Sequence, residues 1–89
     1  FWHPSASRDG RFFTSDVYPG GEVVVGSLRT GRYKLLCHSG ASCGAPQYTH
    51  PHPFFSPDGR YVLFNSDRRG LPHIWLAEIP EGFLEELES

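Results

Sequence analysis

The 89-residue chain has no methionine, only two cysteines and no long hydrophobic run. Because a membrane helix needs about 20 apolar residues and a signal peptide needs a basic segment before its apolar core, the sequence predicts neither. Since the chain starts at Phe1 without a methionine, we expect the natural chain to begin further upstream. A domain of this length is marginally stable alone, so we interpret it as one small domain or a piece of a larger one.

An excess of either charge is also absent. The net charge is −2 with acidic and basic residues intermixed, which predicts no nucleic-acid partner. Acidic residues gather only at positions 81–89, where four glutamates surround Phe83, Leu84 and Leu87. We expect this segment to form an acidic tail or a short helix without a chemical role.

Cys37 and Cys43 lie in a segment rich in glycine, serine and alanine. Their spacing matches neither a CxxC redox motif nor a paired zinc framework. We expect two free thiols, which favours a reducing compartment and so a cytoplasmic location, with the periplasm left open. A zinc site formed by Cys37, His38 and Cys43 would lack a fourth ligand at normal spacing.

The sequence repeats itself at an offset of 49 residues. Residues 3–12 align without gaps onto residues 52–61, and His, Pro, Ser, Asp, Gly and Arg recur in register. Downstream, the Ser-Asp pair at 15–16 is matched to the Ser-Asp pair at 66–67 after a two-residue length difference. A period near 50 made of short strands is typical of β-propeller blades.

The Asp-Gly pairs at 9–10 and 58–59 predict hairpin turns, because glycine accepts the positive φ that such turns require. The runs after these turns predict five strands, at 11–14, 22–27, 32–38, 61–65 and 73–79. The second copy has no fourth strand, and the last blade of a closed propeller commonly takes that strand from the chain's own N-terminus.

We therefore predict an all-β fragment of a β-propeller, with about two four-stranded antiparallel blades of which the last is incomplete. Residues 1–44 would form a complete blade, 45–80 the final blade without its fourth strand, and 81–89 the tail. Two blades cannot close a ring, and their open edges would be a liability.

The run at 47–53 contains the strongest candidate site. His50 and His52 are two residues apart, and on an extended strand such side chains point to the same side, about 6.5 Å apart. A proline follows each histidine and favours an extended backbone. The amide oxygen of Gln47 can turn back toward the same point. By the repeat, His3 has the position of His52 in the neighbouring blade, and equivalent positions at the start of innermost strands converge on the propeller axis.

Three imidazoles and one amide are a neutral ligand set, so a bound ion would keep its full positive charge and suit an anionic substrate such as a carboxylate. Manganese, iron, zinc, nickel and cobalt all fit these ligands. The alternative is that each histidine is simply packed or hydrogen-bonded, which is the favoured interpretation for His3 taken alone.

Other polar residues are given ordinary roles. We interpret His38 and His73 as surface or hairpin residues. Arg68 and Arg69 are expected to be exposed in a hairpin loop, with contact to an acidic substrate as the minor alternative. Three aspartates are interpreted as turn formers that cap backbone amides, namely Asp16, Asp58 and Asp67.

Two resemblances add to this interpretation. Residues 55–70, with Ser-Pro-Asp-Gly-Arg at 56–60, continue to Ile-Trp-Leu at 74–76 and resemble the repeat of TolB-like propellers. That repeat indicates a fold and is almost silent on function. The second set of motifs is Trp-His at 2–3, Ser-x-Asp-Gly-Arg at 7–11 and Gln-x-x-His-x-His-Pro at 47–53. Together they resemble the C-terminal part of oligogalacturonate lyases, polysaccharide lyase family 22.

The second resemblance implies a seven-bladed propeller with a divalent metal near its axis, Mn²⁺ being the expected ion. Its ligands, three histidines and one glutamine, map onto His3, Gln47, His50 and His52. It also implies β-elimination from oligogalacturonides: a cation beside the uronate carboxylate stabilises developing charge, while a base removes the C5 proton and the C4 oxygen departs.

The resemblance places the base, a histidine, and a substrate-binding arginine in earlier blades. The catalytic and substrate-binding residues are therefore unknown in this chain, and we expect the fragment alone to be inactive. The alternative function is a TolB-like propeller domain that serves protein binding or a peptidase, without lyase activity. A third possibility is a relative that keeps the metal but acts on another sugar. The expected partner is an oligogalacturonide, with no nucleic acid and no membrane, and the oligomeric state is left open.

Overall fold

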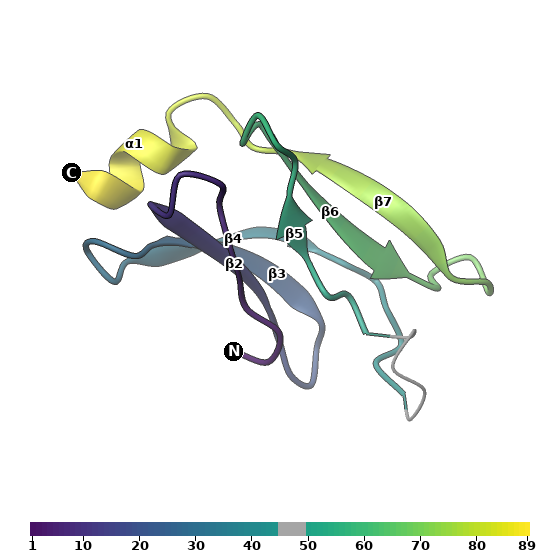
Figure 1. The fold of residues 1–89 in the computed structure, drawn as a ribbon. Helices are drawn as coiled ribbons and strands as arrows, with labels where there is room; N and C mark the ends of the chain where they lie inside the picture. Colours follow the sequence, from purple (N-terminus) through teal and green to yellow (C-terminus); the bar gives the residue numbers. More distant parts are fainter. Residues whose placement is uncertain (45–49) are drawn as a thin grey trace.

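The computed structural model describes residues 1–44 and 50–89. Two antiparallel sheets lie next to each other (Figure 1). The first has the order β1 (Ser5–Ala6), β2 (Phe12–Val17), β3 (Glu22–Ser27) and β4 (Tyr33–His38). The second has the order β5 (Phe54–Phe55), β6 (Tyr61–Ser66) and β7 (His73–Glu78), followed by the helix α1 (Phe83–Glu88). The prediction of an all-β fold with a four-stranded and a three-stranded antiparallel sheet is confirmed. Among the described residues, no helix is long and apolar enough to cross a membrane.

The two Asp-Gly turns have the same construction. The Ser7 hydroxyl donates to Asp9 Oδ1 over 2.6 Å, and the Arg11 amide donates to the same oxygen over 3.0 Å. The Ser7 hydroxyl and the Arg11 amide thereby hold the pKa of Asp9 below its usual value. The same contacts recur, at 2.6 and 3.0 Å, among Ser56, Asp58 and Arg60. The glycines that follow the aspartates have φ of 75° and 72°, as the turn prediction requires.

The two-residue length difference between the repeats lies in a loop and not within a strand. Phe12 and Tyr61, which begin β2 and β6, are offset by 49 residues, whereas Glu22 and His73, which begin β3 and β7, are offset by 51. Asp16 pairs with Val23 in the first sheet, and Asn65 pairs with Ile74 in the second. The structural counterpart of Asp16 is therefore Asn65, and the match of the two Ser-Asp pairs is wrong. The register of β2 with β3 matches that of β6 with β7, so the strands align without an insertion. The two extra residues therefore lie in the β6–β7 loop.

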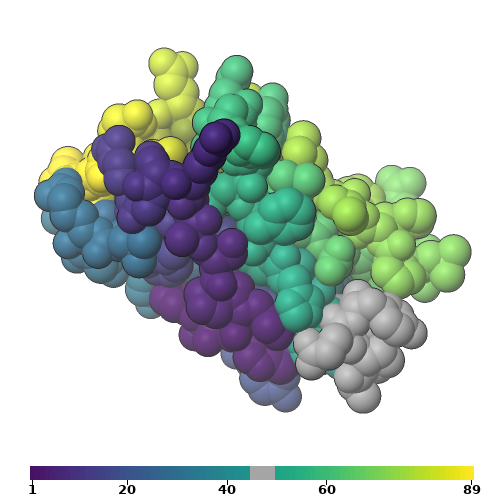
Figure 2. Space-filling view, viewed as in Figure 1, coloured from purple at the N-terminus to yellow at the C-terminus, as the bar shows by residue number. Residues whose placement is uncertain are grey.

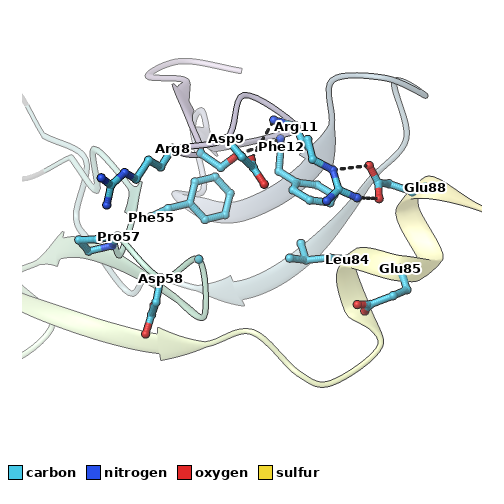
Figure 3. A pocket seen from close by; sticks show the side chains of 12 residues that line it. Arg8, Asp9, Arg11, Phe12, Phe55, Pro57, Asp58, Leu84, Glu85 and Glu88 are labelled. Carbon is cyan, nitrogen blue, oxygen red and sulfur yellow. Dashed lines mark hydrogen bonds and ion pairs between the residues drawn. The ribbon is translucent and has the colours of Figure 1, made fainter.

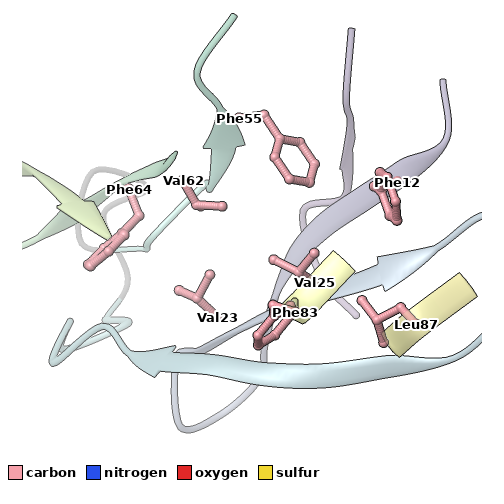
Figure 4. Packing of buried hydrophobic residues seen from close by; sticks show 8 residues of the cluster. All are labelled: Phe12, Val23, Val25, Phe55, Val62, Phe64, Phe83 and Leu87. Carbon is pink, nitrogen blue, oxygen red and sulfur yellow. The ribbon is translucent and has the colours of Figure 1, made fainter. Parts of the chain in front are cut away.

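The hydrophobic core lies between the two sheets and is closed by α1 (Figure 4). Val23, Val25 and Val62 are completely buried. Burying such a side chain stabilises the fold by roughly 1.5–3 kcal/mol, so the contact between the sheets contributes strongly to stability. The complete cluster draws on both sheets and the helix: Phe12, Val23, Val25, Phe55, Val62, Phe64, Phe83 and Leu87.

The helix α1 ties the C-terminus back to the first sheet. Lys34 Nζ lies 4.3 Å from the Phe83 ring centroid and 2.8 Å from Glu86 Oε2. The Thr30 hydroxyl donates to the Leu87 carbonyl over 2.7 Å. These contacts hold α1 against the first sheet, although α1 follows the second sheet in the sequence.

The β6–β7 loop is bonded to the segment that follows β4. Asp67 accepts hydrogen bonds from the Ser42 amide and hydroxyl over 2.8 and 2.6 Å. Arg68 donates to the Ser39 carbonyl from Nε over 3.0 Å and to the His38 carbonyl from Nη2 over 2.9 Å. Asp67 thus caps a backbone amide, as expected, but that amide belongs to the segment that follows β4. Arg68 is exposed, as expected, and its guanidinium also links the two sheets.

A hollow of about 490 Å³ lies between the two Asp-Gly turns and α1 (Figure 3). Its walls include Phe12, Phe55 and Leu84, with charged side chains around them. The turns that line it follow the inner strands β1 and β5, whereas His3 and His52 precede those strands. The hollow is therefore separate from the histidine site.

Candidate metal centre

Three histidines converge where the inner strands of the two sheets begin. One ring nitrogen from each of His3, His50 and His52 lies within 4.8 Å of the others. The ring centroids are 3.8 Å apart for His3 and His52, and 5.6 Å apart for His3 and His50. In Figure 2 the purple N-terminal segment lies against the teal start of the second sheet. The structure therefore brings together the three histidines that the repeat predicted to meet, and their role as ligands stays a prediction.

The backbone around His52 differs from the prediction. His52 has a φ of 44°, in the left-handed region, so the expectation of an extended run is wrong. The His52 amide lies 3.4 Å from Asp16 Oδ2, and the preceding Pro51 carbonyl accepts from the Asn65 amide over 2.7 Å. These tertiary contacts turn the chain here, and the His50 and His52 rings lie 6.1 Å apart. A strained φ of this kind typically costs about 1–3 kcal/mol and is found preferentially at functional sites.

Asp16 holds His3 from a completely buried position in β2. Its Oδ1 accepts from the His3 amide over 2.8 Å, and its Oδ2 lies 2.8 Å from His3 Nδ1. Since a carboxylate only accepts, Nδ1 carries the proton in this contact, and in the neutral ring Nε2 then keeps its lone pair for a ligand. Asp16 accepts from backbone amides, as expected, but the prediction that it forms a turn is wrong, because it lies within β2 and pairs with Val23. The sequence carries one signal of the role of Asp16: the other residues of β2 are apolar or carry a hydroxyl group, whereas Asp16 carries a carboxylate.

Within the described part of the chain, one ring nitrogen of His50 has no hydrogen-bond partner. The side chain is 4% exposed, and its Nε2 lies 2.7 Å from the Gly44 carbonyl. Because a carbonyl only accepts, Nε2 must donate, which leaves a lone pair on Nδ1. Nδ1 is buried and has no partner among the described residues. Leaving such an atom unpaired costs about 1–3 kcal/mol, and a bound cation would satisfy it.

The donor set fits a divalent transition-metal ion. In the neutral form that metals require, His3 Nε2 and His50 Nδ1 would each offer a lone pair. His52 adds a third ring at the same point. The fourth predicted ligand, Gln47, lies outside the described residues. The predicted ligands are neutral, but the buried carboxylate of Asp16 adds a negative charge beside them.

The other candidate residues lie elsewhere. His38 and His73 are exposed, at the end of β4 and the start of β7. Cys37 and Cys43 are free thiols, and burial raises the pKa of both. Within the described ranges, the three histidines form a group that could hold a metal ion, and neither cysteine belongs to this group.

Comparisons with known proteins bear on this site. No family model matches the sequence. Over 63 residues, or 66% of the chain, it is 38% identical to an oligogalacturonate lyase of Dickeya dadantii (strain 3937) and 41% identical to an oligogalacturonide lyase of Pectobacterium atrosepticum. A crystal structure of an oligogalacturonate lyase from Vibrio parahaemolyticus matches 91% of the chain, with a TM-score of 0.81 and 30% identity.

The predicted resemblance to oligogalacturonate lyases is confirmed. A second structure of an oligogalacturonate lyase, in complex with manganese, matches 92% of the chain with a TM-score of 0.81 and 27% identity. A putative TolB from Agrobacterium tumefaciens matches 82% with a TM-score of 0.61 and 25% identity. These neighbours confirm the propeller blades. The chain spans 16% of the length of the curated lyases and 24% of the two lyase structures.

Proposed function

We propose that the full-length protein is a metal-dependent lyase that cleaves oligogalacturonides by β-elimination, and that this chain supplies its metal site. The observation that carries the proposal is the convergence of His3, His50 and His52 in a chain similar to oligogalacturonate lyases. The buried Nδ1 of His50, which has no hydrogen-bond partner among residues 1–44 and 50–89, supports it further. The proposed ligands are these histidines and Gln47, and the proposed ion is Mn²⁺, since one of the similar lyase structures contains manganese.

The chemistry divides between the ion and the protein. A bound divalent cation supplies positive charge that polarises a uronate carboxylate and stabilises the charge left when the adjacent proton is removed. This chain's own residues position the ligands: Asp16 orients His3, and the Gly44 carbonyl orients His50. The Trp2 ring covers His50 at a centroid distance of 4.1 Å and limits water on that side. The base and the arginine for substrate are proposed to lie in blades outside this chain.

We also propose the blade boundaries at 1–44 and 45–80, with the acidic helix segment at 81–89. Support comes from Ile74 and Leu76 of β7 and from Leu71 in the loop before it, which are 67%, 60% and 68% exposed. An apolar surface of this kind on a blade calls for a neighbour, which further blades of a ring would supply. The free thiols of Cys37 and Cys43 favour a cytoplasmic location.

Metal analysis and a lyase assay on the full-length protein test this function together. We expect about one transition-metal ion per chain, and an unsaturated product, detected by its ultraviolet absorbance, when trigalacturonate is added. Chelation should abolish product formation, and added Mn²⁺ should restore it. Protein that binds no transition metal would contradict the site. Metal-loaded protein that forms no unsaturated product would contradict the substrate and favour a TolB-like binding function.

A further inference from the structure

Asp16 contacts two of the predicted ligands, His3 and His52, at the junction of the two blades. Its side chain is buried, with 1% of its surface exposed. Oδ1 accepts from the His3 amide, while Oδ2 faces both the His3 ring and, over 3.4 Å, the His52 amide. His3 belongs to the first blade and His52 to the second. A single carboxylate therefore fixes the position of two histidines that are distant in sequence.

Only a carboxylate satisfies all three contacts. The His3 amide and the His52 amide are donors, and a carboxylate offers acceptor sites on both oxygens. An asparagine at the same place would present one oxygen and one NH₂ group. If the NH₂ group faced the His3 ring, it would favour the tautomer with the proton on Nε2. If it faced the His3 amide, two donors would meet. Either arrangement leaves a buried mismatch, which typically costs about 1–3 kcal/mol.

The position is special to the first blade. The structural counterpart of Asp16 in the second blade is Asn65, which pairs with Ile74 as Asp16 pairs with Val23. The repeat therefore has no general need for a carboxylate at this point of the second strand. The need is specific to the place where His3 and His52 meet.

We propose that Asp16 is a positioning residue of the metal centre, which holds His3 with Nε2 free for the ion and fixes His52 next to it. The inference rests on the proposed metal site and extends it to a residue that contacts no ion. Carboxylates hydrogen-bonded to metal-binding histidines act in this way in known sites, and their loss weakens metal affinity by about 10- to 100-fold.

The test uses the full-length protein with Asp16→Asn, and Asp58→Asn as the matched control. Asp58 also accepts hydrogen bonds from one hydroxyl and one backbone amide, but it lies in an exposed turn that follows the inner strand. Mn²⁺ affinity is measured from the electron paramagnetic resonance signal of the free ion. The tautomer of His3 in the metal-free protein is read from its ¹⁵N imidazole resonances. Thermal midpoints show whether each variant is folded.

We expect Mn²⁺ to bind Asp16→Asn about 10- to 100-fold more weakly than wild type, and Asp58→Asn within about twofold of wild type. In metal-free wild type, His3 should be protonated at Nδ1. Equal affinity of Asp16→Asn and wild type would overturn the role of Asp16 while the metal site stands. A wild-type protein that binds no Mn²⁺ would overturn the metal site itself. If Asp16→Asn does not fold, the wild-type tautomer decides: a His3 protonated at Nε2 overturns the role.

Discussion

The rings of His3 and His52 lie 3.8 Å apart, centroid to centroid, although 49 residues separate them in the sequence. They hold the same position in two successive repeats, each just before the inner strand of its sheet. A site at this place depends on the packing of both blades, so changes to the core between the blades should affect metal binding as well as stability.

Replacing His50 tests the buried ligand. His50→Ala removes one of the three clustered imidazoles, including the buried Nδ1 that has no partner among the described residues. Because a direct ligand is lost, we expect Mn²⁺ affinity to fall by more than the roughly 10- to 100-fold seen for outer-shell partners. Isothermal titration calorimetry on the full-length protein measures this affinity. His73→Ala, at an exposed position, should bind like wild type, and equal affinities of the two variants would contradict the assignment.

Gly26 provides a test of the packing in the first sheet. A Cβ added at Gly26 would lie 2.3 Å from two atoms of the Phe13 ring and 2.9 Å from the Arg32 carbonyl oxygen. We expect Gly26→Ala to lower the free energy of unfolding by about 1–3 kcal/mol, as overpacking does. Chemical denaturation measures the loss. In a Phe13→Ala background the same substitution should cost less, and an unchanged cost would show that the ring is not the obstacle.

The helix α1 should contribute to the stability of both blades. Leu87 is 2% exposed in the shared core, and Leu87→Ala leaves a cavity there. We expect the free energy of unfolding to fall by about 2 kcal/mol or more. Leu71→Ala, at a side chain 68% exposed, should change it by less than about 0.5 kcal/mol. Similar unfolding midpoints for the two variants would mean that α1 does not pack as described.

Acid should weaken the link between the β6–β7 loop and the segment that follows β4. The hydroxyl and amide of Ser42 hold the pKa of Asp67 below its usual value of 3.8. A carboxyl whose pKa is lower in the folded state stabilises the fold above the unfolded pKa, and this contribution is lost as the pH falls through the folded pKa. The difference in thermal midpoint between wild type and Asp67→Ala should therefore shrink on acidification from pH about 7 to about 3. A difference independent of pH would contradict this link.

The repeat and the turns were predictable from sequence because they depend on local chemistry. The Asp-Gly pairs fix hairpins, and the alternating runs after them fix strands, so the meeting of His3 and His52 could be expected from their register. The role of Asp16 and the left-handed turn at His52 could not be predicted from the sequence. Both depend on contacts between blades that the sequence does not display, and the Ser-Asp pair at 66–67 suggested a wrong counterpart for Asp16.

The most direct test of the metal centre is anomalous diffraction from crystals of the full-length protein grown with Mn²⁺. The data should be collected above and below the manganese absorption edge. We predict one anomalous peak among His3, His50 and His52, within coordination distance of a nitrogen of each ring. A peak elsewhere in the molecule, or no peak at this position, would contradict the account.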